Sequence, residues 1–231
     1  MWKIPSIKQL TEAGVAFGHR RTRGHPKMAP YIKGIVGTIQ MIDLEKTAEK
    51  LEIALKFLEA TAKNQGVILF VGTKPSAKEI VKKYAEEVEM PYVTEKWIAG
   101  TITNFETINL LRKKFLKMEE EKNKGEWEKY TKKEILELER ELLRLQKMVG
   151  GIRNLEKLPD AFYLIDLVEE KTAVREINRK KIPTVALVDT NTNPELVSHP
   201  IPANDDAIKS VELITSLVAE AIKEGKEKIK K

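Results

Sequence analysis

The 231 residues include no cysteine. This excludes disulfide bonds, thiolate catalysis and cysteine-based zinc sites. No apolar run exceeds five residues, as in Val67–Val71, whereas a membrane-spanning helix needs about 20. The opening residues MWKIP are not followed by an apolar signal core. We therefore expect a soluble protein of the cytoplasm.

Acidic residues are absent between Glu12 and Asp43, and this gap holds a cluster of bases. The run GHRRTRGHPKMAPYIK, Gly18–Lys33, carries five of them: Arg20, Arg21, Arg23, Lys27 and Lys33. Residues 1–40 hold seven Lys/Arg against one acid, whereas the other 191 residues balance 34 bases against 34 acids. The whole formal charge of +6 therefore lies at one end of the chain.

Glycines and prolines divide this run into turns, and its periodicity fits neither a helix nor a strand. A cationic, irregular segment suits a folded polyanion, because RNA is recognised largely by shape and by backbone contacts. Arginine presents a forked donor set to phosphate oxygens and lysine a point charge. The alternative is a solvated basic loop. We also expect partial disorder in Arg20–Lys27 of the free protein, because only Met28 and Tyr31 could anchor it.

Apolar runs alternate with helical patterns along the rest of the chain, and this alternation predicts right-handed βαβ units. The expected fold class is α/β, a three-layer sandwich with a mainly parallel sheet, flavodoxin-like or Rossmann-like. The predicted strands are Val67–Val71, Pro91–Val93, Phe162–Asp166 and Thr184–Val188. The predicted helices are Ser6–Gly14, Leu44–Lys63, Ser76–Val88, Thr172–Lys180 and Asp206–Lys223, with a short extended piece at Gly34–Ile42.

Between the second and third strands the apolar residues recur at three-four spacing in two runs separated by Gly125. The first run is Ile108, Leu111, Phe115 and Met118, and the second is Ile135, Leu138, Leu142, Leu145 and Val149. This spacing predicts an inserted antiparallel coiled-coil hairpin at 104–150. Residues 1–103 and 151–231 then form one α/β domain that includes the basic loop.

Eight collinear blocks carry a resemblance to a known family: GHRRTRGHPKMAPYI, IQMIDLEKT, FVGTK, KWIAGTITNFETI, GGI, LPDAFYLID, IPTVALVDTNTNP and IPANDDAIKS. On these blocks the chain, from about Ile7 to Ala221, resembles the bacterial small-subunit ribosomal protein number two. It departs from the family pattern at four places: Gly24-His25 for Trp-Asn, Gln40 for His, Ala99 for Gly and Ala203 for Gly.

The resemblance implies a structural constituent of the small ribosomal subunit that supports translation without catalysis. Such proteins bind ribosomal RNA and neighbouring ribosomal proteins between head and body, join late in assembly and help to dock the large mRNA-binding ribosomal protein. The resemblance therefore also implies a location in the cytoplasm, on the ribosome.

Lys74 follows the first predicted strand, at a strand-to-helix turn where phosphates often bind. No G-x-x-x-x-G-K-[ST] or G-x-G-x-x-G pattern is present, which argues against a free nucleotide. An RNA phosphate and a plain solvated turn remain as the two readings of Lys74. Lys96 precedes Trp97 and is a further candidate for an RNA contact; Trp97 itself is expected to pack at the root of the hairpin.

Carboxylates follow the later strands: Asp166, Asp189, Asp205 and Asp206. Such groups at the carboxyl edge of a sheet could hold Mg²⁺, and with His19 or His199 a structural zinc. The favoured alternative is a turn at Asp189–Asn191 and a helix cap from Asp205 or Asp206. No cofactor is expected. The second hypothesis for function is a nucleotide- or metal-dependent α/β enzyme that uses Lys74, Asp166 and Asp189.

Overall fold

Five strands form a parallel sheet in the order β5-β4-β6-β7-β8. The computed structural model describes residues 2–228, with β4 (Ile68–Val71), β5 (Tyr92–Val93), β6 (Ala161–Ile165), β7 (Thr184–Val188) and β8 (His199–Pro202). Four of them are the predicted strands. The sequence did not predict β8, because Pro200 and Pro202 are unusual in a strand. The strand lies at the edge of the sheet, where proline is tolerated.

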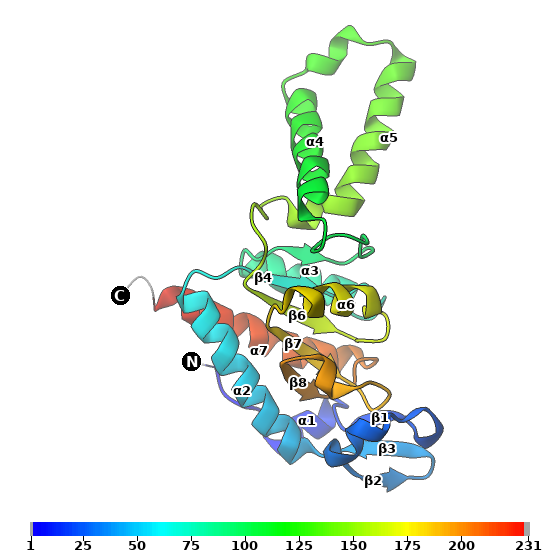
Figure 1. The fold of residues 1–231 in the computed structure, drawn as a ribbon, viewed down its shortest axis with the longest axis vertical. Helices are drawn as coiled ribbons and strands as arrows, with labels where there is room; N and C mark the ends of the chain where they lie inside the picture. Colours follow the sequence, from blue (N-terminus) through cyan, green and yellow to red (C-terminus); the bar gives the residue numbers. More distant parts are fainter. Residues whose placement is uncertain (1, 229–231) are drawn as a thin grey trace.

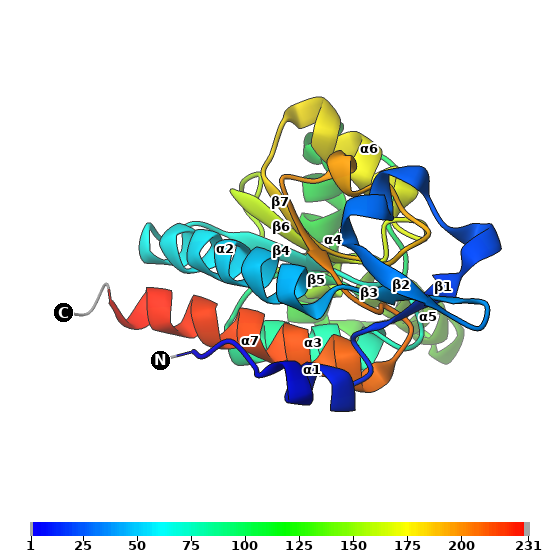
Figure 2. The same cartoon turned by 90° about the horizontal axis from the view of Figure 1, so that it is seen from below.

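Helices cover both faces of this sheet, which confirms the predicted three-layer α/β architecture (Figures 1 and 2). One face packs against α1 (Ile7–Glu12), α2 (Leu44–Lys63), α3 (Lys78–Glu87) and α7 (Ile208–Glu227). The other packs against α6 (Lys171–Lys180) and the root of a helical hairpin. Side chains alternate between the two cores: Phe70 and Tyr163 enter the first, Leu69 and Phe162 the second.

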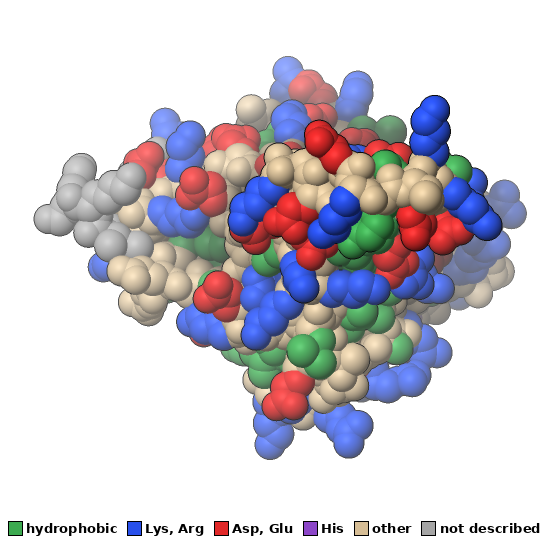
Figure 3. Space-filling view, turned by 90° about the horizontal axis from the view of Figure 1, so that it is seen from above, with side chains coloured by type: hydrophobic (Ala, Val, Ile, Leu, Met, Phe, Trp, Pro, Cys, Tyr) green, Lys and Arg blue, Asp and Glu red, His purple; other side chains and the backbone are tan. Residues whose placement is uncertain are grey.

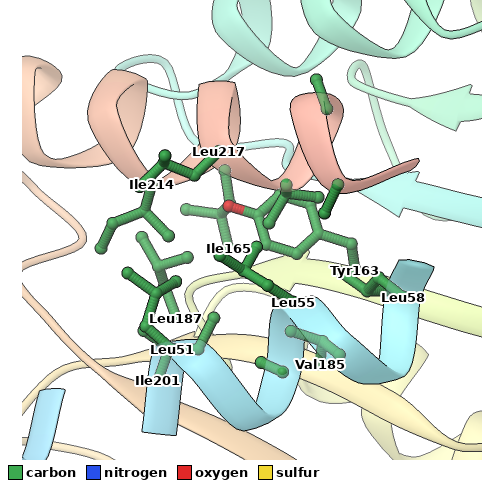
Figure 4. Close-up of a cluster of buried hydrophobic side chains, with 14 of the residues drawn as sticks. Leu51, Leu55, Leu58, Tyr163, Ile165, Val185, Leu187, Ile201, Ile214 and Leu217 are labelled. Atoms are coloured by element: carbon green, nitrogen blue, oxygen red, sulfur yellow. The ribbon is translucent and has the colours of Figure 1, made fainter. Parts of the chain in front are cut away.

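In the first core Tyr163 lies among apolar side chains of the sheet, α2 and α7 (Figure 4). Its hydroxyl lies 2.9 Å from Thr215 Oγ1, and its ring meets Phe70 edge-on. Helix α7 runs past its predicted end and through Gly225 to Glu227. A Cβ at Gly225 would lie 2.4 Å from the Glu59 carbonyl oxygen, so glycine permits the close approach of α7 and α2. None of the helices within residues 2–228 is long and apolar enough to cross a membrane.

The insertion forms two antiparallel helices that stand clear of the sheet (Figure 1). These are α4 (Phe105–Asn123) and α5 (Lys132–Val149), joined through the 3₁₀ turn η3 (Glu126–Lys129). Thr131 and Glu134 form a capping box at the start of α5. The buried seam includes Ile108, Phe115, Met118, Leu145 and Val149. Supercoiling of the pair and the domain boundaries at 104 and 150 remain predictions.

The basic segment contains strands and 3₁₀ turns, so the prediction that it holds no regular element was wrong. Partial disorder of Arg20–Lys27 in the free protein stays a prediction. We call residues 18–33 the basic arm. The chain forms β1 (Phe17–Arg20), the 3₁₀ turns η1 (Arg21–Arg23) and η2 (Pro26–Tyr31), then β2 (Ile32–Val36) and β3 (Ile39–Ile42). The three strands make a small antiparallel sheet in the order β1-β3-β2, with Gly37 at the β2–β3 turn at φ +63°. The extended piece predicted at 34–42 is therefore part of a hairpin.

Candidate nucleic-acid interface

The five bases of the arm lie on its exposed side: Arg20, Arg21, Arg23, Lys27 and Lys33. Within residues 2–228, Lys27 alone among these five forms an ion pair, with Glu195 just beyond β7. The other four have no carboxylate partner in the described part of the chain. Four unpaired cations on an ordered segment are available to an external polyanion.

The arm is held to the body by its main chain and by apolar side chains, with Tyr31 and Ile32 packed against the second core. Met28 is fully buried in the second core. The His25 N–H donates to the Thr190 carbonyl oxygen at 2.8 Å, and the His19 N–H donates to Thr190 Oγ1 at 2.8 Å. A Cβ at Gly18 would lie 2.4 Å from Thr190 Cγ2, so only glycine allows this approach. The arm therefore carries an ordered backbone beneath its exposed cations.

Two of the departures from the family pattern lie against each other in the arm. A Cβ at Gly24 would lie 2.4 Å from Gln40 Oε1, so the Gln40 side chain fills the space beside the glycine. His25 takes a role that suits the asparagine it replaces, because its Nδ1 accepts the Lys27 N–H at 3.2 Å and caps η2. Nothing in the structure explains the alanine at position 99.

Lys74 points inward, which corrects the expectation of a solvated turn. Its Nζ lies 2.7 Å from Asp205 Oδ1, 3.1 Å from Asp166 Oδ2 and 2.5 Å from Asp206 Oδ1. Burial opposes the charge on Lys74, but the hydrogen bonds from Asp205 and Asp206 outweigh it, and the net pKa of Lys74 is raised. Because three internal carboxylates hold this cation, we do not include Lys74 in the proposed RNA interface.

Asp205 is the most strongly perturbed acid of this cluster. Its side chain is fully buried, and burial raises its pKa to about 7. The negative charges of Asp166 and Asp189 add to that effect, while Lys74 opposes it. The expected cap on α7 was wrong: the helix begins after Ala207 without a side-chain cap, and Asn204 Oδ1 accepts the N–H groups of Asp206 and Ala207 instead.

His19 joins the same edge of the sheet from the basic arm. Its Nδ1 lies 3.1 Å from Asp189 Oδ2 and its Nε2 lies 3.4 Å from Asp206 Oδ2. The hydrogen bond with Asp189 raises the pKa of His19 against the effect of its burial. One ligand atom from each of these three residues lies within 4.8 Å of the others, a set that suits a cation of the zinc type. His199, the other candidate nitrogen ligand, stacks on Phe57 with ring centroids 4.4 Å apart.

Asp189 also forms the turn that the sequence predicted, because its Oδ1 accepts the Thr190 N–H at 2.5 Å and its carbonyl accepts the Thr192 N–H at 3.2 Å. Its other oxygen, Oδ2, faces His19 Nδ1 at 3.1 Å, whereas Asp205 Oδ2 is buried without a hydrogen bond. A turn and a ligand role are therefore compatible at Asp189, through different oxygens.

Another buried carboxylate, that of Glu176 on α6, was not foreseen from the sequence. Its Oε1 accepts the Gly100 N–H at 2.7 Å and Trp97 Nε1–H at 3.2 Å. Its Oε2 accepts the N–H groups of Ile102 and Thr103 and the Thr103 hydroxyl, each at 3.1 Å. Although burial opposes its charge, these donors lower the net pKa of Glu176. No short motif marks such a clamp, because acceptor and donors lie about 75 residues apart.

The contacts of Glu176 with residues 97–103, which we call the Glu176 clamp, fix the positions of Trp97 and Lys96, the last two candidates from the sequence. Trp97 is 8% exposed and packs in the second core against Phe162, as expected. Lys96, next to it, is exposed and has no ion pair within residues 2–228. Glu176 therefore fixes the loop that carries Lys96 and leads into α4.

Fold and arm together define a class: an α/β protein that presents unpaired cations at one end and a protruding helical hairpin at the other (Figure 1). The family model for ribosomal protein S2 matches residues 10–225. The small ribosomal subunit protein uS2 of Dictyoglomus thermophilum is 48% identical over 221 residues, covering 96% of this chain and 90% of the relative. The chain belongs to the ribosomal protein S2 family. It is thus a structural protein of the small ribosomal subunit and not an enzyme, which sets the enzyme hypothesis aside.

Proposed function

We propose that this chain binds ribosomal RNA through its basic arm, with Arg20, Arg21, Arg23 and Lys33 as phosphate contacts. The observation that carries the proposal is the absence of any carboxylate partner for these four side chains within residues 2–228. Cations that are exposed and unpaired exchange their counterions for phosphates, which makes binding salt-dependent. Lys27 becomes a further phosphate contact if its ion pair with Glu195 breaks. Lys96 adds a phosphate contact near the hairpin.

The resemblance to the ribosomal protein family also suggests where this chain lies on the small subunit and which proteins it contacts. The chain would lie between the head and the body of the small subunit, in the cytoplasm, among neighbouring ribosomal proteins, and would help to dock the large mRNA-binding one. The arm and the hairpin lie at opposite ends of the molecule, and this separation suits a protein that joins several neighbours (Figure 1). These particulars rest on the family, and residue-level crosslinking in assembled subunits tests them.

The main experiment replaces Arg20, Arg21 and Arg23 with alanine. The melting temperature should stay near that of the wild type, because all three side chains are exposed. Binding to subunits that lack this protein should weaken, and the dependence of log K on log salt should flatten by about 2. As a matched control, replacing the exposed Lys56, Lys63 and Lys223 removes the same charge from α2 and α7. Equal binding by both variants would refute the role of the arm.

We further propose a cation site at His19, Asp189 and Asp206. It is supported by ligand atoms within 4.8 Å of one another and by the buried carboxylate of Asp189, whose Oδ2 faces His19 Nδ1 at 3.1 Å. Titration of the free protein with Zn²⁺ should give one site and raise the melting temperature. His19→Ala should abolish both effects, and His199→Ala should leave both unchanged. Binding that survives His19→Ala would exclude this site.

A further inference from the structure

The outer face of α5 differs from the rest of the hairpin surface. Opposite the seam, exposed residues follow one another at three-four spacing along this helix: Lys133, Leu136, Arg140, Leu143 and Lys147. Three cations thus recur every second turn along one line, which spans about 21 Å at 1.5 Å per residue. Such a line is straight and rigid because the seam anchors the helix beneath it.

None of Lys133, Arg140 and Lys147 has an ion pair within residues 2–228. The carboxylates of α5 are directed elsewhere: Glu141 pairs with Lys114 at 3.0 Å and Glu139 with Lys122 at 2.8 Å, both across to α4. The interhelical pairs therefore remove the carboxylates that could neutralise the outer face. Glu137 is the one acid at its border.

The outer face of α4 provides the contrast. Two of its cations are matched by acids one turn away, with Lys117 at 3.7 Å from Glu121 and Lys124, which caps the end of the helix, at 2.6 Å from Glu120. Lys113 has no ion pair within residues 2–228. Figure 3, which looks down on the hairpin end, shows Lys and Arg side chains with carboxylates between them. Internal ion pairs therefore neutralise two of the three cations Lys113, Lys117 and Lys124 on the α4 side, but none of Lys133, Arg140 and Lys147 on α5.

We propose that the outer face of α5 is a second contact for an RNA phosphate backbone, made by Lys133, Arg140 and Lys147. The inference rests on the proposed function, because it assumes that the chain binds RNA, and it names the side of the hairpin that faces the RNA. Unpaired cations in a row meet a polyanion without first breaking internal ion pairs. Leu136 and Leu143 are single exposed apolar side chains, which are common on surfaces and need no partner.

The lower limit of this contact is set by a groove of about 660 Å³ between the hairpin root and the α3–β5 side of the body. Lys147 lies at its edge, and the opposite side carries four carboxylates: Glu79, Glu86, Glu89 and Glu95. Lys82 lines the same wall, and Lys78 and Lys226 pair with Glu95 and Glu89, so the charge of the groove is mixed. The proposed RNA contact therefore runs along the outer face of the helix, from Lys133 to Lys147.

The test compares two charge-matched triple variants of the full chain in binding to small subunits that lack this protein, across a salt series. The first changes Lys133, Arg140 and Lys147 to alanine, and the control changes Lys113, Lys117 and Lys124 to alanine. The α5 variant should bind at least tenfold more weakly than the control, with a slope of log K against log salt reduced by about 2. Melting curves should show both variants folded, because all six side chains are exposed.

Equal binding by the two triple variants would overturn the inference while leaving the proposed function intact. A Leu136→Ser, Leu143→Ser variant that loses binding, beside an α5 triple variant that keeps it, would assign the face to a protein partner and would also overturn it. If the wild-type chain itself does not bind, the proposed function fails, and this inference fails with it.

Discussion

The ammonium group of Lys74 lies 2.7 Å from the buried carboxylate of Asp205, at the carboxyl edge of the sheet. Asp166 approaches the same ammonium group from the end of β6. Asp206 contacts both Lys74 and His19, so the cluster connects the turn after β4 to the start of the basic arm. One lysine therefore neutralises acids from two parts of the chain beneath the proposed interface.

Replacing this lysine with an isosteric apolar residue should destabilise the fold. Lys74→Met leaves Asp166 and Asp205 buried without a cation, and breaking a buried ion pair typically costs about 3 kcal/mol or more. Urea denaturation at neutral pH measures the change in the free energy of unfolding. The control is Lys78→Met, whose partner Glu95 is 53% exposed at 3.4 Å and whose loss should cost less than about 1 kcal/mol. Equal losses would show that the cluster does not need its cation.

The Glu176 clamp makes a prediction about the loop that leads to the hairpin. Glu176→Ala leaves four N–H groups and one hydroxyl without their acceptor, which should cost at least about 2 kcal/mol of unfolding free energy. The opened space presents those donors to solvent anions. Added acetate should therefore restore part of the melting temperature of the variant, whereas it should not affect Leu110→Ala, an exposed control on α4. Absence of rescue would argue that packing, and not the carboxylate, holds the loop.

The same clamp has a defined pH dependence. The pKa of Glu176 in the fold lies below its ordinary value of 4.5. A lowered pKa means that the unfolded chain binds more protons in this range, so the contribution of Glu176 is complete above about pH 4.5 and is lost as the pH falls through the folded pKa. The stability difference between the wild type and Glu176→Gln should therefore be constant near neutral pH and shrink in acid. A difference that grows in acid would contradict this sign.

The sequence predicted those features that depend on local patterns. The continuous apolar runs at β4, β6 and β7 and the three-four spacing of α4 and α5 each reflect burial within a few residues, so they were correctly assigned. Features fixed by distant partners were missed. The arm is regular because Thr190 and the buried Met28 hold it, and β8 forms despite two prolines because it pairs with β7 on one side only. Lys74 and Glu176 likewise meet partners from other elements.

The root of the hairpin should depend on a single glycine. Gly151, in the 3₁₀ turn η4 (Gly150–Ile152), faces the edge strand β5 so closely that a Cβ would lie 2.3 Å from the Tyr92 carbonyl oxygen. The Tyr92 carbonyl belongs to the backbone of a paired strand, so it cannot move aside as a flexible side chain could. Gly151→Ala should therefore destabilise the protein by about 1–3 kcal/mol and speed proteolysis near the root. At Gly150 the nearest atom is the flexible Gln146 Cγ at 3.3 Å, so Gly150→Ala is the matched control.

Position 24 offers a test of coupling between two departures from the family pattern. Three atoms of the Gln40 side chain lie within 2.9 Å of a Cβ built on Gly24. Gly24→Trp must displace that side chain, which should cost about 1–2 kcal/mol. Oε1 of Gln40 has no hydrogen-bond partner in the structure. Replacing Gln40 therefore breaks no hydrogen bond at this oxygen.

Gln40→His, the residue that the family usually shows, should therefore cost little alone and should reduce the cost of Gly24→Trp. A double-mutant cycle by urea denaturation measures the coupling, expected to be at least about 0.5 kcal/mol because the two side chains share one space. Pairing Gly24→Trp with a change at the exposed Lys33 supplies the uncoupled reference. Additive effects in the cycle with Gln40 would mean that the two departures arose independently of this contact.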